Sequence, residues 1–264
     1  MQHNLLHCYD RQVWEIDNEY RMKITNVFSP SRFWIVTRIQ EHDLLHRFLQ
    51  HFYSLYQDFY WLHKSQLCQN QHYVVMAFGS YYRAVLRNAT PIHGNEDVRV
   101  FLVDYGISTT VRLKNVFHLL GELCNVPVFA IQATFSGVKP TESWTWSPDS
   151  TDAFRDMVQD KLLKGKLKHL DDVNKTIELE LDEYYNQTGG RNLIRKALLD
   201  QKLANPLTDS NEKKDLDAQQ PSFSSIEEGF GFDQELDDYL LLEITLSYLD
   251  IGEILITSIS QFGS

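Results

Sequence analysis

The sequence predicts an α+β fold in which a small five-stranded β-barrel lies between two groups of strands that belong to a second lobe. Short β-branched and aromatic runs recur between residues 71 and 127 at the spacing of a small, strongly bent barrel. An apolar stripe of helical period precedes them, and further strand-like runs occur before that helix and after the barrel. This order predicts a barrel inserted into a split second lobe, to which the long helix joins it.

Residues 19–62 are expected to form the first part of the second lobe and the linker helix. Two β-branched and aromatic runs within 19–40 predict two strands joined by a turn at Pro30. From 41 to 62, apolar residues recur every three or four positions, which predicts a long amphipathic helix that starts near His42. We expect its aromatic stripe to pack in the core.

The barrel is expected within residues 66–127. Its four clearest strand runs are HYVVMAF, YYRAVLRNA, VRVFLVDYG and TTVRLKNVFHL. Gly79 and Gly106 fall at two of the turns, where a residue with positive φ is often required. A fifth strand is predicted over residues 129–140.

Residues 128–204 are expected to complete the second lobe. Ser147 followed by Pro148 predicts the start of a helix, and two strand runs and a last helix come after it. Residues 19–40 and 147–204 should together build one lobe. That prediction requires the first strands to pair with a strand that lies beyond position 160.

The net charge of −11 is confined to the C-terminal part of the chain. Residues 1–204 contain 23 acidic and 23 basic side chains, so this part is neutral. Because phosphate binding depends on clustered Lys and Arg, we expect no strong direct nucleic-acid binding. The acidic stretch 205–238 predicts a disordered linker. The apolar residues 239–264 form either a docked element or a partner-binding segment.

The composition points away from membrane, secreted and metal-binding classes. No run approaches the ~18 apolar residues of a membrane helix, and the N-terminus is polar. The three cysteines, Cys8, Cys68 and Cys124, are far apart and lack metal-ligand spacing, which fits a reducing compartment. We therefore expect a cytoplasmic protein without a cofactor or a metal site.

Two motifs on neighbouring strands carry a family resemblance. AFGSYYRA (77–84) and VFLVDYG (100–106), followed by residues 123–132, resemble a Tudor domain. The flanking strands and helices resemble a split staphylococcal-nuclease-like OB lobe. Over about residues 19–204 the chain therefore looks like an extended Tudor domain of the germline Tudor family, similar to its Tejas-like and Krimper-like branches.

The resemblance implies a role rather than a reaction. It suggests a non-catalytic adaptor of the piRNA gene-silencing pathway that binds a Piwi-family tail or an RNA helicase. It also implies a location in the perinuclear germ granule, or nuage. No nucleophile or second acid accompanies Asp104 in a recognisable catalytic arrangement, so we predict no catalytic residue. Asp104 is instead expected to pair with Arg83 and brace the barrel.

The resemblance also implies a methylarginine cage. Its positions are Phe78, Tyr82, Leu102, Tyr105 and Ile107. A methylated guanidinium is a flat, weakly hydrated cation that aromatic rings bind through their faces. Leu102 stands where the family usually has a ring, and Ile107 stands where it has the asparagine that bonds the guanidinium. We therefore expect an incomplete cage. Losing one cation–π contact and one hydrogen bond to a charged group weakens binding by about 2–4 kcal/mol.

Several alternatives remain at this point. The chain could be a true symmetric-dimethylarginine reader, or it could take an unmethylated Piwi segment. Phe78 and Tyr82 could also serve only as barrel packing. A nuclease-like enzyme is an alternative of another class, but it needs clustered acids and a basic groove, and the neutral residues 1–204 argue against one.

Overall fold

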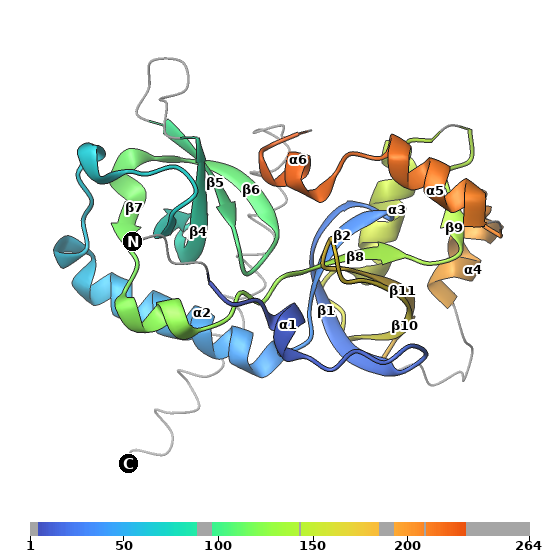
Figure 1. Cartoon of the computed structure of the whole chain (residues 1–264), viewed down its shortest axis with the longest axis horizontal. Helices are drawn as coiled ribbons and strands as arrows, with labels where there is room; N and C mark the ends of the chain where they lie inside the picture. The colour runs from blue at the N-terminus through green and yellow to red at the C-terminus, as the bar shows by residue number, and fades with distance from the viewer. Residues whose placement is uncertain (1–4, 89–96, 143, 185–192, 209, 231–264) are drawn as a thin grey trace, which may run out of the picture.

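The computed structural model of the chain describes residues 5–88, 97–142, 144–184, 193–208 and 210–230. Two lobes lie side by side along the long axis, with the longest helix beneath the left-hand lobe and the C-terminal helices on the opposite side (Figure 1). The α-helices are α1 (Cys8–Arg11), α2 (Ile39–Tyr56), α3 (Pro148–Val158), α4 (Leu193–Asp200), α5 (Ser210–Gln219) and α6 (Phe223–Glu227). The mixed α+β class agrees with the prediction.

The first lobe is a closed five-stranded barrel of order β1-β10-β11-β8-β2. Its strands are β1 (Glu19–Ser29), β2 (Arg32–Val36), β8 (Ile131–Phe135), β10 (Leu163–Asp171) and β11 (Thr176–Glu183). β1 pairs with β10, for example Glu19 with Lys166, so residues before and after the second lobe share one sheet, as the strand order predicted. Buried and half-buried positions alternate along β10 and β11, as expected for strands with one face on a core.

The second lobe is a five-stranded antiparallel sheet of order β6-β5-β4-β3-β7. Its strands are β3 (His72–Ala77), β4 (Ser80–Asn88), β5 (Asp97–Leu102), β6 (Ile107–Arg112) and β7 (Val116–His118). We call this unit the Tudor sheet, after the resemblance of its motifs. Two short strands outside both lobes, β9 (Val138–Lys139) and β12 (Asn205–Pro206), pair with each other.

Two expectations about the Tudor sheet are corrected. Its fifth strand is β7 and not residues 129–140, because β8 pairs with β2 and β11 in the closed barrel. Among the described strands no pairing closes the Tudor sheet into a ring, although a five-stranded barrel was predicted. The three residues of β7 pair with β3, and no pairing of β7 with β6 is present among the described strands. The nuclease-like character of the closed barrel stays a prediction.

Helix α2 buries only part of its apolar stripe, and the expectation that the aromatic stripe packs in the core is wrong for Phe48, Tyr56 and the following Phe59, which are exposed. It begins at Ile39, before the predicted start, so His42 lies inside the helix and is buried rather than capping it. Leu45, Leu49 and Tyr53 also belong to the core. The helix ends in a 3-10 turn over Gln57–Phe59, which accounts for the longer predicted span.

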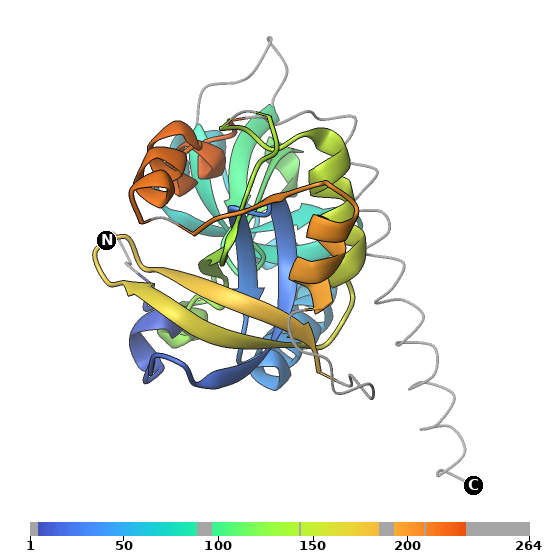
Figure 2. The same cartoon turned by 90° about the vertical axis from the view of Figure 1, so that its right-hand side faces the viewer.

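A helix start that the sequence predicted is present as expected. Ser147 precedes α3, its hydroxyl accepts a hydrogen bond from the amide of Ser150, and Pro148 occupies the first turn. The helix packs Phe154 and Val158 into the closed-barrel core. In the view of Figure 2, α3 and α4 lie together on one side of the barrel strands.

The prediction of a disordered acidic linker is wrong for residues 210–230. This segment forms α5 and α6 and makes ion pairs with both lobes, among them Arg32–Asp217 and Arg87–Glu227. Its average composition predicted disorder, but Leu216 and Ile226 are buried and anchor it. The expected apolar segment 239–264 lies outside the described residues.

Within the described residues, no helix combines the length and apolar character needed to span a membrane.

Candidate functional site

The turn between β5 and β6 is held in place by a buried ion pair. The guanidinium of Arg83 donates from Nε and Nη2 to the two carboxylate oxygens of Asp104, at 2.9 and 2.6 Å. It also donates to the backbone carbonyls of Leu123, Val126 and Pro127 at 2.7–3.1 Å. These bonds tie the end of β5 to the segment that leads into β8, which confirms the bracing pair that the sequence predicted.

The glycine of this turn is fixed by the closed barrel. Gly106 has φ +76°, and a Cβ there would overlap the ring of Trp34 on β2. Asn26 on β1 donates to the carbonyl of Gly106 at 2.6 Å. Position 106 therefore requires glycine for two reasons, its left-handed backbone conformation and its close approach to Trp34. Tyr105, between these two anchored residues, has little freedom to move.

The structure brings the five implied cage positions together. Phe78, Tyr82, Leu102, Tyr105 and Ile107 belong to or pack against one apolar cluster. Leu102 pairs with Ala84 on β4 and with Ile107 on β6, which places strand positions from β4, β5 and β6 on one face of the sheet. The rings of Tyr82 and Tyr105 meet edge to face, with centroids 5.1 Å apart and an interplanar angle of 88°.

Phe78 has an unusual backbone conformation. It has φ +50° and is followed by Gly79 at φ +75°, so both residues of this two-residue turn lie in the left-handed region. Such turns favour Asn, Asp and Gly, and a bulky residue there costs roughly 1–2 kcal/mol. The Phe78 side chain is also only half-buried. Strain of this kind is concentrated at binding sites, so Phe78 is a candidate for function rather than packing.

Two histidines of α2 complete the surroundings of the rings. His46 Nδ1 lies 3.0 Å from the hydroxyl of Tyr105, and its ring centroid lies 5.8 Å from that of Tyr82. The ring of His42 packs edge to face on Tyr105, with centroids 4.6 Å apart. The pKa of His46 is lowered to about 4, first by burial and then by the nearby His42, while Asp43 opposes the shift. His46 is therefore neutral near pH 7.

The sequence did not identify these histidines as neighbours of the rings. Their spacing of four residues places them on one helix face, which is a usable signal. Nothing in the sequence shows which face turns toward the Tudor sheet. Among the described residues, no group of three or more His, Cys, Asp or Glu is arranged to hold a metal ion.

Leu102 and Ile107 differ in depth. Leu102 is fully buried at 0% exposure, whereas Ile107 is 6% exposed and follows the turn directly. Because Leu102 is completely buried, a larger ring at position 102 would overpack the core, which typically costs 1–3 kcal/mol. Only position 107 is therefore suitable for restoring the polar group that the resemblance implies.

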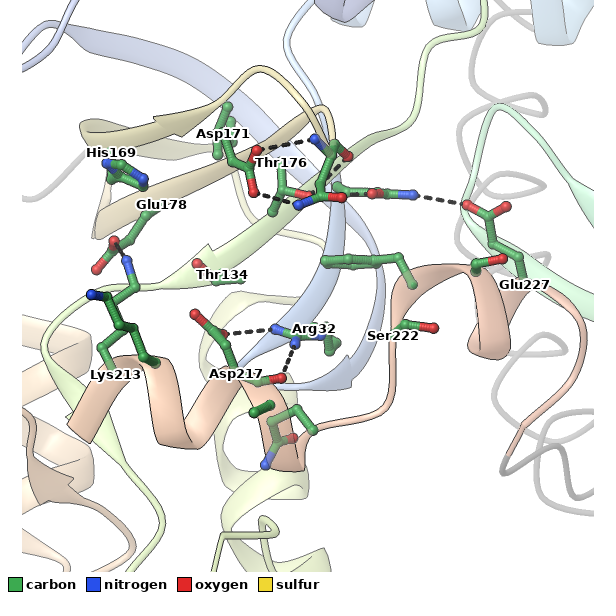
Figure 3. Close-up of a pocket in the computed structure, with 18 residues that line it drawn as sticks. Arg32, Thr134, His169, Asp171, Thr176, Glu178, Lys213, Asp217, Ser222 and Glu227 are labelled. Carbon is green, nitrogen blue, oxygen red and sulfur yellow. Dashed lines mark hydrogen bonds and ion pairs between the residues drawn. The ribbon is translucent and has the colours of Figure 1, made fainter. Parts of the chain in front are cut away.

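A separate pocket of about 860 Å³ lies between the closed barrel and the C-terminal helices (Figure 3). Strands β8, β10 and β11 form one wall and α5 and α6 the other. None of the five cage positions contributes to it. The pocket is crossed by Arg32–Asp217 and Lys213–Glu178 contacts, so its charges are largely paired.

Comparison with protein families and sequences gives one family match and two curated relatives. Residues 15–137 match the Tudor domain family. Human "Tudor domain-containing protein 6" is 29% identical over 180 residues, which is 67% of this chain and 8% of that protein. The "Probable ATP-dependent RNA helicase spindle-E" of Culex quinquefasciatus is 27% identical over 113 residues, which is 39% of this chain and 8% of that protein. The chain thus spans less than a tenth of these curated relatives.

Solved structures share the fold at lower identity. The extended Tudor domain TD3 of mouse TDRD1, in complex with a MILI peptide containing dimethylarginine, has a TM-score of 0.64 and 16% identity, and covers 78% of this chain and 100% of its own. A variant of the Drosophila melanogaster Papi extended Tudor domain, in complex with an unmethylated Piwi N-terminal peptide, has a TM-score of 0.63 and 16% identity, with 72% and 100% covered. The family match and the shared fold together support an extended Tudor domain.

Proposed function

We propose that this chain is a non-catalytic protein-binding module that takes arginine-containing segments of partner proteins at Phe78, Tyr82, Leu102, Tyr105 and Ile107. The observation that carries the proposal is the placement of Phe78. Its ring is half-buried against the apolar cluster that contains Tyr82 and Tyr105, on a backbone that disfavours a bulky residue. Packing alone gives no reason to retain a Phe there, whereas binding a cation against its ring does.

The fold comparisons support an arginine-containing ligand. Structures of this fold were determined with a dimethylarginine peptide in TDRD1 and with an unmethylated Piwi peptide in Papi. Both kinds of ligand are therefore compatible with an extended Tudor fold. The choice between them depends on the residues that each chain places at its site.

Leu102 and Ile107 favour a ligand that does not need methylation. A fully buried Leu102 supplies no ring face, and Ile107 supplies no hydrogen-bond acceptor for the guanidinium. Losing one cation–π contact and one hydrogen bond to a charged group costs about 2–4 kcal/mol. We therefore propose an incomplete cage that distinguishes methylated from unmethylated arginine by less than about tenfold.

The partner and the setting form the finer part of the proposal. The curated relatives are a Tudor domain-containing protein and a probable RNA helicase, and the Papi ligand is a Piwi peptide. These names support an adaptor of the piRNA pathway that docks a Piwi-family tail or an RNA helicase. A perinuclear germ-granule location and a Tejas-like or Krimper-like subtype rest on the sequence resemblance.

A Phe78→Asn variant separates binding from packing. Asn tolerates the left-handed conformation, so we expect the free energy of unfolding to change by less than about 1 kcal/mol. Binding of an Arg-Gly peptide, measured by calorimetric titration, should weaken at least tenfold because a ring face is lost. If the variant is destabilised by more than about 2 kcal/mol and binds the peptide normally, the ring only packs and the proposal fails.

An Ile107→Asn variant tests the incomplete cage. The new amide oxygen can accept a guanidinium N–H, so binding of a symmetrically dimethylated Arg-Gly peptide should strengthen about tenfold, or about 1.4 kcal/mol. Ile107→Val is the matched control, since it keeps the apolar wall. A wild-type chain that already prefers the methylated peptide by far more than tenfold would identify a true reader and refute the incomplete cage.

A further inference from the structure

The C-terminal helices connect the two lobes on the side opposite α2 (Figure 1). Helix α6 lies on the Tudor sheet, where the hydroxyl of Ser108 on β6 donates to the carbonyls of Ile226 and Glu227, both at 2.9 Å. Helix α5 lies beside the closed barrel, where Lys213 pairs with Glu178 on β11. One short segment therefore contacts both lobes.

The surface beneath α6 is an apolar groove with a basic rim. We call it the junction groove, because its residues come from β2, from β4 and β5, and from the segment between the lobes. Its apolar floor is formed by Trp34, Val85, Phe101 and Val128. Its basic rim is formed by Arg32, Arg87 and Arg99. The guanidinium of Arg87 also lies over the Phe101 ring, 5.5 Å from its centroid.

Two apolar side chains of the segment fill this groove. Ile226 is 5% exposed and belongs to the same cluster as Trp34 and Phe101. The ring of Phe223 meets Trp34 edge to face, with centroids 5.1 Å apart, and the guanidinium carbon of Arg32 lies 5.2 Å from the centroid of the Phe223 ring. The anchors are three residues apart, so they share one face of a single helical turn.

All three rim arginines bind this segment. Arg87 pairs with the carboxylate of Glu227 at 2.5 Å, and Gln132 donates to the same carboxylate at 2.9 Å. Arg99 donates to the carbonyl of Glu228 at 3.1 Å. Arg32 donates to the carbonyl of Pro221 at 2.9 Å. A groove of this chemistry selects an acidic helix with two apolar anchors.

Part of the segment is separated from the closed barrel by an open space, although Ile226 itself is packed into the apolar cluster. The pocket of about 860 Å³ remains between the segment and the barrel, as Figure 3 shows from Lys213 to Glu227. Helix α6 has five residues, too few to be stable in isolation, so its order depends on the groove. Burial raises the pKa of Glu227, which Arg87 and Gln132 counteract. Such a segment belongs to the low-stability units of a fold.

We propose that the junction groove is a docking site for a short acidic helix of a partner protein, and that residues 221–228 occupy it in the free chain. The partner segment carries an aromatic residue, an isoleucine three positions later and a glutamate directly after it. The chain's own segment competes at an effective concentration in the millimolar range, so a partner binds only when it displaces that segment. This proposal does not depend on the arginine site.

The test uses the full chain and a fluorescein-labelled peptide, QPSFSSIEEGF, which corresponds to residues 220–230. In the Ile226→Asp chain the resident segment loses its main anchor. Fluorescence anisotropy should then show the peptide binding at least tenfold more tightly than to wild type. A control peptide with aspartate in place of its isoleucine should not bind. Adding Arg87→Ala to the Ile226→Asp chain should weaken peptide binding at least fivefold.

Equal binding of the intact and control peptides to a folded Ile226→Asp chain would overturn the proposal. If circular dichroism shows that this chain is unfolded, the Glu227→Ala chain takes its place with the same expected gain. Hydrogen exchange of the wild-type chain provides an independent measurement. The amides of residues 225–229 should exchange at least a hundredfold faster than those of β4 and β5. Equal protection of the two sets would show that the segment is a fixed part of the fold.

Discussion

Removing the carboxylate of Asp104 should destabilise the whole fold more than any surface ion pair does. Arg83 has no solvent exposure, and Asp104 is 2% exposed. In Asp104→Ala the guanidinium loses two hydrogen bonds and its counter-charge, while it stays buried. The backbone amide of Phe129, which donates to Asp104 at 3.1 Å, loses its acceptor as well.

The expected loss is about 3–5 kcal/mol, the usual cost of breaking a buried ion pair by removing one partner. For a chain of this size, each kcal/mol lowers Tm by about 2–4 °C, so Tm should fall by roughly 6–20 °C. Arg83→Met should cost at least as much, because the carbonyls of Leu123, Val126 and Pro127 lose their donor too. The double change Arg83→Met with Asp104→Leu should cost less than the sum, by about 1–3 kcal/mol.

Urea unfolding followed by circular dichroism measures these losses, and thermal melts check them. Glu183→Ala is the matched control, because its ion pair with Lys161 has a similar length of 2.9 Å but both side chains are about half exposed. That control should lose less than about 1 kcal/mol. An Asp104→Ala loss no larger than the control would refute the assignment of this pair as the brace of the β5–β6 turn.

Three further predictions concern the turns, the pH dependence and nucleic acid. Gly106→Ala should lower the free energy of unfolding in urea by about 2–5 kcal/mol, because Trp34 occupies the space of the new Cβ. Gly79→Ala, at φ +75°, meets nothing within 4 Å and should cost only about 1–2 kcal/mol. Similar losses at both positions would contradict the close contact with Trp34. The pKa of His46 is about 4 when folded against 6.5 when unfolded, so the unfolded state binds the extra proton and stability should fall, by about 3 kcal/mol at most, as pH drops from 6.5 to 4. His46→Gln should flatten that pH range, and an unchanged slope would count against the buried neutral imidazole. Because residues 1–204 are net neutral, single-stranded RNA should bind with a Kd above about 1 μM in a gel-shift assay at 150 mM salt, and tighter binding would refute this expectation.

Local patterns in the sequence predicted most elements of the fold. Helix α2 follows from its apolar spacing, α3 from Ser147 and Pro148, and the β3–β4 hairpin from Gly79. The assignment of strands to sheets was less accurate. Residues 131–135 have the same β character whether they join the Tudor sheet or the closed barrel, and only long-range pairing with β2 and β11 decides between them.

The C-terminal segment shows why composition fails for a short docked element. Residues 210–230 are polar on average, but Leu216 and Ile226 meet a preformed surface, and an average over the segment hides two well-placed anchors. The sequence also predicts the geometry of the candidate site only in part. Alternation along β5 predicts which face of the sheet Leu102 lies on, but not how deeply it is buried. The contact of His46 with Tyr105 depends on how α2 packs on the sheet.

The most direct measurement of the central claim is a methyl NMR titration of the wild-type chain with an Arg-Gly peptide, with the isoleucine δ1 methyl groups labelled. Ile107 reports on the arginine site, Ile226 on the junction groove and Ile177 on the closed-barrel core. We predict that the Ile107 signal shifts with peptide, to a similar extent for methylated and unmethylated forms, while the Ile226 and Ile177 signals stay unchanged. A titration in which Ile107 does not move, while Ile226 or Ile177 does, would contradict the proposed site.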